Sequence, residues 1–278
     1  MGLAYVHRMN AHEESPLLSV IDGVALTDFR PAEESSRTPL IFVHGGLHGS
    51  WQWDSTQRWF ADAGRRSISL DWFAHGGSRQ LDASEWLRRS ILDVREEIGV
   101  AVAQCASPPI LIGHSMGGLA SLAYAATHPS RIAGLVLLAP VVPERFAGAP
   151  VELPIDVDQP WGPPPLDIAA HLFFDGAPAA EHEAIYAQLQ AESPTAVWEA
   201  TRWTATVDVD AITVPVLVIT GDKDELTPVD IVSSLAEGIG AELVTLPGVG
   251  HGLSFDQSWI DQCARIDSWA SKILNEVS

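Results

Sequence analysis

Residues 110–118 read Ile-Leu-Ile-Gly-His-Ser-Met-Gly-Gly, and the architecture of the whole chain can be worked out from this segment. Its first three residues are apolar and predict a short strand that is buried on both faces of a parallel sheet. Residues 115–127 are small and apolar almost all round, which predicts a helix packed against that sheet. The glycines on either side of Ser115 suit a strained turn between strand and helix, because they lack the Cβ atoms that would collide there. We therefore expect Ser115 at the carboxyl edge of the sheet, with its hydroxyl exposed and the helix N-terminus beneath it.

Similar apolar segments recur before and after this one, and they predict further buried strands at Leu40–Val43, Ser67–Leu70, 135–138, 216–219 and 243–246. Residues 17–30 precede them all and predict two strands joined at Asp22-Gly23, a pair typical of tight hairpin turns. The intervening segments predict helices at 51–63, 83–104, 115–127, 229–237 and 258–274. A hairpin followed by alternating strands and helices is typical of an α/β fold. The expected architecture is a mostly parallel eight-stranded sheet with helices on both faces.

One segment departs from this alternation. Residues 141–210 are rich in proline, and a structureless loop of that length is uncommon in a compact domain. We therefore expect a helical lid inserted into a core made of residues 1–140 and 211–278. We expect the aromatic side chains of the insertion to contact substrate; the alternative is that they only build its own small core. These residues are Trp161, Phe173, Phe174, Trp198 and Trp203.

Composition excludes several classes of partner. The 278 residues include 16 Lys and Arg against 36 Asp and Glu, a formal net charge of −20, which repels phosphate backbones and anionic lipid. We therefore expect neither nucleic acid nor a membrane surface as a partner. The sequence has no apolar run as long as a membrane span and no signal-peptide pattern, so we expect a cytoplasmic protein. Cys105 and Cys263 stand far apart and no ligand cluster or Gly-x-Gly-x-x-Gly pattern is present, so we expect no metal and no cofactor. A homodimer is left open.

Three segments carry residues suited to nucleophilic catalysis. A serine hydroxyl is a weak nucleophile until a base takes its proton, and His251 follows the last predicted strand, at the same sheet edge as Ser115. An acid must orient that base, and Asp222, Asp224 and Glu225 all follow the strand at 216–219 and are rivals for the role. The other histidines of the sheet-edge loops are interpreted as loop-shaping residues; they are His44, His48, His75 and His114.

A glycine-rich loop at 44–51, His-Gly-Gly-Leu-His-Gly-Ser-Trp, follows the strand Leu40–Val43. Acyl transfer creates an oxyanion, which two fixed backbone N–H groups stabilise. The N–H of Met116, directly after the nucleophile, is one expected donor, and Gly46 is the position we choose for the other.

From about residue 17 to its end, apart from the insertion, the chain resembles the α/β-hydrolase superfamily. In that family's Gly-x-x-Asp-x-x-x-Pro segment the aspartate is catalytic, and residues 221–228 place Asp224 there. Residues 71–78 are similar to the family's Asp-x-x-Gly-x-Gly-x-Ser loop, with Ala74 in place of a glycine. The loop at 44–51 looks like that of small-ester members such as plant methylesterases and hydroxynitrile lyases, which implies Gly46 as a donor. Such lyases carry a lysine after the catalytic histidine, whereas Gly252 follows His251 here.

The resemblance implies a serine hydrolase that cleaves a small carboxylic ester or lactone through an acyl-enzyme intermediate. Ser115 would be the nucleophile, His251 the base and Asp224 the acid. The same groups serve thioesters and C–C bonds next to a carbonyl, so those hydrolases remain alternatives. A lyase or cofactor-free oxygenase on this scaffold, and a binding protein that turns over nothing, are further alternatives. The aromatic, proline-rich insertion favours an apolar or aromatic acyl or alcohol group.

Overall fold

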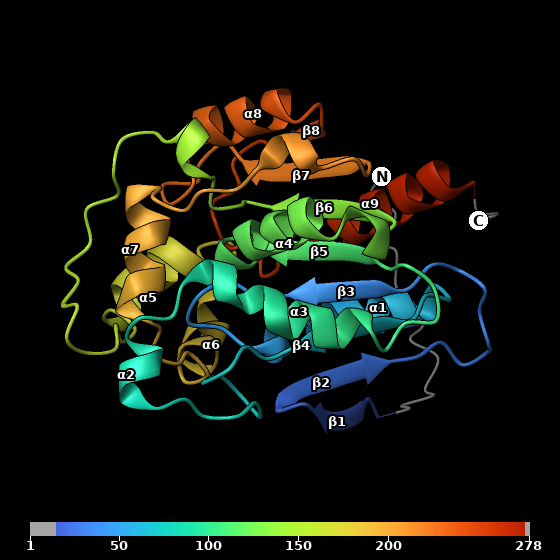
Figure 1. The fold of residues 1–278 in the computed structure, drawn as a ribbon, viewed down its shortest axis with the longest axis horizontal. Coiled ribbons are helices and arrows are strands. Elements are labelled where there is room, and N and C mark those ends of the chain that lie inside the picture. The colour runs from blue at the N-terminus through green and yellow to red at the C-terminus, as the bar shows by residue number, and fades with distance from the viewer. Residues whose placement is uncertain (1–14, 276–278) are drawn as a thin grey trace.

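A computed structural model describes residues 15–275, and a single twisted sheet runs through its centre (Figure 1). Its eight strands lie in the order β1-β2-β4-β3-β5-β6-β7-β8. The first two strands form an antiparallel hairpin, β2 pairs antiparallel with β4, and all other pairs are parallel. The predicted mostly parallel eight-stranded sheet is confirmed. The strands are β1 (Leu17–Ile21), β2 (Val24–Phe29), β3 (Leu40–Val43), β4 (Ser67–Leu70), β5 (Ile110–His114), β6 (Gly134–Leu138), β7 (Val216–Gly221) and β8 (Glu242–Leu246).

The hairpin turn forms where the sequence predicts it. Asp22 and Gly23 have φ values of 50° and 82°, both in the left-handed region that tight two-residue turns require. Ile21 pairs with Val24 across the turn. The turn thereby starts the sheet with an antiparallel ribbon beside the parallel strands.

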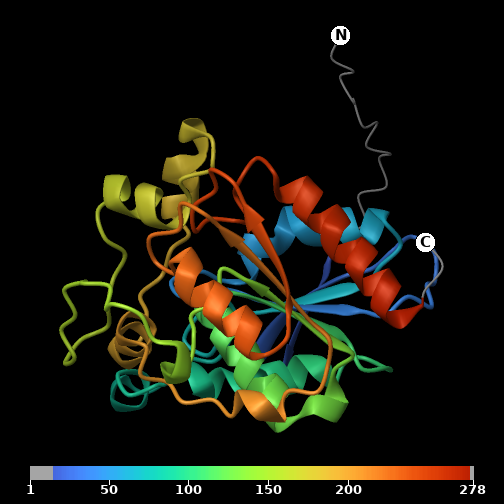
Figure 2. The same cartoon turned by 90° about the horizontal axis from the view of Figure 1, so that it is seen from above.

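Helices cover both faces of the sheet (Figure 2). On one face α1 (Asp54–Asp62) and α9 (Trp259–Leu274) share a core with side chains from β3 and β5. On the other face α3 (Arg95–Val102), α4 (Met116–Thr127) and α8 (Val229–Gly238) share a second, larger core. The parallel strands β3 and β5 between these layers are buried along their whole length, as their apolar sequences predict.

The predicted helix at 83–104 is interrupted. The structure has a single turn, α2 (Ala83–Trp86), then a 3₁₀ turn, η2 (Ile91–Val94), that leads into α3. Ser90 causes the break, because its side chain accepts the N–H of Leu92 at 3.0 Å while the Asp93 carboxylate accepts the N–H of Ser90 at 2.9 Å. This reciprocal capping starts a new helix instead of continuing the old one.

The segment between β6 and β7 lies beyond the carboxyl ends of the parallel strands (Figure 1). It contains α5 (Leu166–Phe173), α6 (His182–Tyr186) and α7 (Pro194–Arg202). Its apolar side chains, including Phe173 and Ile185, pack together with Leu47 from the loop after β3. The insertion therefore rests on the sheet edge that carries Ser115. The remaining short elements are 3₁₀ turns at Ser50–Trp53, Pro129–Arg131, Glu144–Phe146, Ala179–Glu181 and Val209–Ala211.

The loop at 71–78 is built around the Asp71 carboxylate, which accepts the N–H groups of Ser50 at 2.6 Å and Gly77 at 2.9 Å. Ala74 in this loop has a φ of 66°, a conformation that costs a residue with a Cβ about 1–2 kcal/mol. The position that holds glycine in the family pattern thus needs a left-handed backbone here too. Ala74 adopts this backbone conformation although it has a Cβ, so the loop keeps its shape with local strain at this residue.

None of the helices within residues 15–275 combines the length and the apolar character needed to cross a lipid bilayer.

Candidate active site

Ser115 stands at the junction of β5 and α4 with φ 54° and ψ −121°. A Cβ on Gly113 would lie 2.3 Å from the carbonyl oxygen of Gly117, and one on Gly117 would lie 2.2 Å from that of His44. Real side chains cannot occupy such positions, so both flanking glycines are sterically required. The predicted strained turn is therefore present, and it packs directly against the end of β3.

The structure brings Ser115, His251 and Asp224 together. Ser115 Oγ lies 2.8 Å from Nε2 of His251, and Nδ1 of His251 lies 2.8 Å from Oδ2 of Asp224. An ionised carboxylate only accepts hydrogen bonds, so Nδ1 carries the ring proton and Nε2 presents a lone pair to the serine hydroxyl. His251 and Asp224 are buried. Their arrangement can draw a proton from Ser115 and hold it during a reaction.

Several donors hold the Asp224 carboxylate. Its Oδ1 accepts the N–H groups of Leu226 at 2.9 Å and Thr227 at 2.8 Å, and the Thr227 hydroxyl donates to Oδ2 at 2.7 Å. Burial alone would raise the pKa of Asp224, but His251 and the two Thr227 donors lower it below its ordinary value. The carboxylate therefore stays ionised beside the imidazole.

The two rival acids lie elsewhere. Asp222 accepts the N–H of Gly248 at 2.7 Å and braces the loop that leads to His251. Glu225 is exposed and lies 3.4 Å from the equally exposed His171. Of the three carboxylates, Asp224 alone contacts His251.

The loop at 44–51 lies against the turn that holds Ser115. A Cβ on Gly45 would lie 3.2 Å from Cβ of Ser115, and one on Gly46 would lie 2.5 Å from Sδ of Met116. Within residues 15–275, neither the Gly46 N–H nor the Met116 N–H has a hydrogen-bond acceptor. Both candidate donors are thus left for an oxygen atom outside the chain.

A buried hydrogen-bonded chain behind the triad was not predicted. Gln52 Oε1 accepts the Gly45 N–H at 3.2 Å, and its Nε2 donates to Nδ1 of His114 at 2.9 Å. The proton of the His114 ring is therefore on Nε2, which donates to the backbone oxygen of His251 at 3.0 Å. Burial holds the pKa of His114 well below its ordinary value, so the ring stays neutral. His114 does shape the loops as interpreted, but no signal in the sequence marked Gln52 as its partner.

An apolar pocket opens onto Ser115. Trp161 and Phe173 line it, together with aliphatic side chains such as Val141 and Leu153. Lys, Arg, Asp and Glu are absent from its described lining. The pocket therefore suits an uncharged, apolar group next to the reacting bond.

Of the five aromatic residues of the insertion that we expect to contact substrate, two line the pocket, Trp161 and Phe173, and three do not, Phe174, Trp198 and Trp203. Phe174 is fully buried against His182 and Phe255. Trp203 is also buried, and its indole N–H donates to the Ala149 carbonyl at 3.0 Å. Trp198 is 44% exposed and lies beside the Arg202 guanidinium. Phe174 and Trp203 are therefore packing residues, in part against the core of the protein, and Trp198 is a surface residue.

Among residues 15–275, no group of three or more His, Cys, Asp or Glu side chains is placed so that it could hold a metal ion.

Comparison with known proteins agrees with the fold. The model of the alpha/beta hydrolase family matches residues 40–266, so the chain belongs to this family and is an enzyme of the hydrolase type. A non-heme chloroperoxidase of Burkholderia pyrrocinia is 27% identical over 86% of this chain and 93% of its own length. A monoacylglycerol lipase of Mycolicibacterium smegmatis is 26% identical over 83% of this chain and 87% of its own. The crystal structure of a putative aryl esterase from Burkholderia cenocepacia matches with a TM-score of 0.70 and 22% identity, covering 94% of this chain and 99% of the other.

The contacts of the three acids predict unequal effects of neutralising them. Asp224→Asn keeps the shape of the site but allows the wrong imidazole tautomer, and we expect kcat to fall by about 10⁴-fold. Asp222→Asn and Glu225→Gln should each leave kcat near that of the wild type, because neither carboxylate touches the ring. Steady-state kinetics on an aryl ester measure all three variants. A larger loss in Asp222→Asn than in Asp224→Asn would contradict the assignment of the acid.

Proposed function

We propose that this enzyme hydrolyses uncharged carboxylic esters or lactones through an acyl-enzyme intermediate on Ser115. The observation that carries the proposal is the continuous hydrogen-bonded line from Asp224 through His251 to Ser115 at the bottom of an apolar pocket. The relatives named as a lipase and an esterase support an ester as the substrate.

In the first half of the reaction, Ser115 Oγ attacks the acyl carbon while Nε2 of His251 takes the hydroxyl proton. The electron pair of the carbonyl double bond moves onto oxygen, and the N–H groups of Gly46 and Met116 stabilise the resulting oxyanion. When the intermediate collapses, the bond to the alcohol oxygen breaks, and His251 gives its proton to that oxygen. Asp224 stabilises the imidazolium between these steps.

In the second half, a water molecule takes the place of the alcohol. His251 removes its proton as the water oxygen attacks the acyl carbon, and a second oxyanion forms in the same position. Collapse releases the carboxylic acid and returns the proton to Ser115 Oγ. A lactone follows the same steps, except that its alcohol and acid groups leave as one molecule.

The chloroperoxidase relative favours oxidative chemistry as a second candidate function on this site. A halogenation assay with peroxide and halide, run beside the ester assay on the same preparation, separates the two. The values of kcat/KM for an ester, a thioester and a C–C substrate that share one acyl group then show which hydrolytic reaction the enzyme prefers.

We further propose that residues 141–210 act as a lid that selects substrates. The insertion leaves the sheet after β6 and returns before β7, and it supplies Trp161, Phe173 and Val197 to the pocket wall. A covered site excludes water, which strengthens the electrostatic interactions made by the triad and the oxyanion donors.

Removal of the nucleophile tests the reaction directly. Ser115→Ala should fold normally and lose ester hydrolysis, with a remainder of at most ~10³–10⁴ over the uncatalysed rate from binding and the oxyanion donors. His251→Ala should be equally inactive, and the double variant little worse than either, because the two side chains act as one unit. Kinetics with a matched circular dichroism spectrum check both statements. Turnover of Ser115→Ala close to that of the wild type would refute the mechanism.

Alanine substitutions in the insertion test its role in specificity. Trp161→Ala and Phe173→Ala should change the ratio of kcat/KM between short and bulky esters by a factor that corresponds to ~1–3 kcal/mol, since each removes an apolar contact with the substrate. Trp198→Ala is the matched control, and its ester ranking should stay that of the wild type. Trp203→Ala should lower the melting temperature, because its side chain is buried and hydrogen-bonded. An unchanged ranking in both pocket variants would rule out the insertion as a specificity device.

A further inference from the structure

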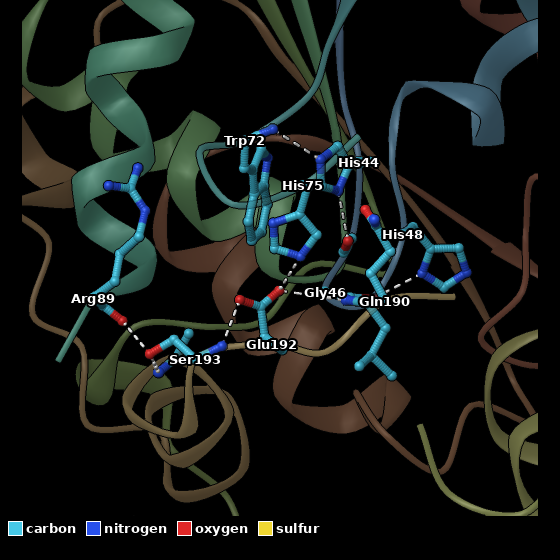
Figure 3. A network of polar contacts seen from close by, with 12 residues as sticks. His44, Gly46, His48, Trp72, His75, Arg89, Gln190, Glu192 and Ser193 are labelled. Atoms are coloured by element: carbon cyan, nitrogen blue, oxygen red, sulfur yellow. Dashed lines mark hydrogen bonds and ion pairs between the residues drawn. The ribbon is translucent and has the colours of Figure 1, made fainter. Parts of the chain in front are cut away.

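A buried carboxylate from the insertion reaches into the loop at 44–51 (Figure 3). Glu192 is 2% exposed, and its Oε2 accepts the N–H of Leu47 at 3.3 Å and lies 3.3 Å from Nε2 of His75. Its other oxygen, Oε1, accepts the N–H of Ser193 at 2.8 Å. The triad does not use this carboxylate, so its burial calls for another explanation.

Glu192 completes a set of contacts that hold the two peptide groups around Gly46. The carbonyl of Gly45, which belongs to the peptide that carries the Gly46 N–H, accepts from Nδ1 of His44 at 2.8 Å. The Gly46 carbonyl accepts from Nδ1 of His48 at 2.8 Å, and Glu192 takes the N–H of that same peptide. The loop is thereby held on both sides of its candidate oxyanion donor.

The backbone at Leu47 needs such restraint. Its φ is 67°, in the left-handed region, and a residue with a bulky side chain stays there only when its surroundings enforce it. Gln190 adds to this restraint, because its N–H donates to the Leu47 carbonyl at 2.8 Å. Both backbone groups of Leu47 are thus bound by residues of the insertion.

The position of Glu192 is itself well fixed. Its N–H and carbonyl pair with those of Trp161, each at 2.9 Å, and the Ser193 hydroxyl donates to the Arg89 carbonyl at 2.7 Å. The side chain of Gln190 accepts the N–H of Gly76 at 2.8 Å. The bonds to Arg89 and Gly76, together with those to Leu47, tie the segment at 190–193 to three separate loops of the core.

An uncompensated negative charge on Glu192 would destabilise the oxyanion of the proposed reaction. A Cβ on Gly46 would lie only 3.5 Å from Glu192 Oε2, so the charge stands close to the residue whose N–H is the candidate oxyanion donor. A protonated His75 would supply the compensating charge, since its Nδ1 lies 3.3 Å from the Phe73 carbonyl oxygen and its Nε2 lies 3.3 Å from Glu192 Oε2. Burial alone would lower the pKa of His75, but Glu192, the Phe73 carbonyl and Asp71 raise it above its ordinary value, whereas burial lowers the pKa of the neighbouring His44. In turn, His75 lowers the pKa of Glu192 against the effect of burial.

We propose that Glu192 is a positioning residue of the oxyanion loop and that His75 neutralises its charge, so that the insertion holds the Gly46 N–H in place for catalysis. The proposal rests on the ester hydrolysis proposed above. It makes the insertion part of the machinery for transition-state stabilisation, beyond any effect on which substrate enters.

A purely structural ion pair would have different consequences. If the pair only fastened the insertion to the core, its loss would lower stability, and any kinetic effect would follow the melting temperature. Glu199 provides the matched control, because it also joins the insertion to the core, through the Ser90 hydroxyl at 2.8 Å and the Ile91 N–H at 2.8 Å, and does not contact the loop at 44–51.

The first experiment compares Glu192→Ala, Glu192→Gln and Glu199→Gln. We expect Glu192→Ala to lose about 10²-fold in kcat with KM near that of the wild type, because a misplaced oxyanion donor acts on the transition state. The amide oxygen of Glu192→Gln can still accept the Leu47 N–H, so kcat should return to within about tenfold of wild type. A trifluoromethyl ketone that mimics the tetrahedral intermediate should lose affinity in parallel with kcat/KM. Glu199→Gln should change neither kcat nor that affinity.

The second experiment tests the charge. His75→Asn leaves Glu192 unpaired and should lower kcat, whereas His75→Asn/Glu192→Gln, which has no charge to neutralise, should be at least about tenfold faster than His75→Asn. If the ion pair had only a structural role, the double variant would have a lower kcat than His75→Asn, because it has lost more contacts. If His75→Asn or Glu192→Ala does not fold, the comparison of Glu192→Gln and the double variant with wild type decides, because the kcat of both must stay within about tenfold of the wild-type value.

Three results would overturn the proposal. One is an unchanged kcat in Glu192→Ala, another is a double variant slower than His75→Asn, and the third is a low kcat in both Glu192→Gln and the double variant. Failure of the proposed function looks different, because the wild type itself would then lack Ser115-dependent ester hydrolysis. Each variant is compared with a wild-type and a Ser115→Ala preparation on the same day, so the two failures can be told apart.

Discussion

Two pieces of backbone meet at Gly117, where the first turn of α4 touches the end of β3 so closely that a Cβ would lie 2.2 Å from the carbonyl oxygen of His44. This contact places the helix N-terminus that carries Ser115 directly beside the loop that carries Gly46. Neighbouring parallel strands end at the same sheet edge, so β3 and β5 supply both halves of the arrangement. Ser115, the proposed nucleophile, and the two candidate oxyanion donors thus come from one tight junction in the middle of the sheet.

The rest of the site is built outward from that junction in two directions. On one side, β7 and β8 end in the loops that carry Asp224 and His251, and the Gln52–His114 chain joins the backbone of His251 to Gly45. On the other side, the insertion lines part of the pocket, and its Glu192 accepts the N–H of the Gly46–Leu47 peptide. In the proposed mechanism the core of the sheet determines where the reacting atoms lie, and the insertion adds a pocket wall and a restraint on the loop.

The sequence predicted most of what depends on local pattern. Apolar runs marked the parallel strands, Asp22-Gly23 marked the hairpin, and the two glycines beside Ser115 marked the strained turn, because each of these features is set by neighbouring residues. The break at Ser90 was missed although Ser90 and Asp93 have the spacing of a capping pair, since the apolar stripe around them favours one long helix. Ala74 shows that a glycine pattern can survive substitution where the surrounding hydrogen bonds enforce a left-handed backbone.

What the sequence could not predict depends on contacts between distant segments. The pairing of His75 with Glu192 requires the path of the insertion to be known in advance, and that of Gln52 with His114 requires the packing of the 3₁₀ turn at Ser50–Trp53. For the same reason the five aromatic residues of the insertion could not be divided between pocket, core and surface. Their separation follows from how α5 and α7 pack, which no local pattern encodes.

Covalent trapping of the nucleophile tests the central claim most directly. The protein is treated with an alkyl fluorophosphonate and digested, and the modified residue is located by tandem mass spectrometry. If Ser115 is activated by His251 as described, a single adduct forms on Ser115, and its rate of formation falls sharply in the His251→Ala variant. An adduct on another residue, or an enzyme that turns over esters while Ser115 stays unmodified, would contradict the account.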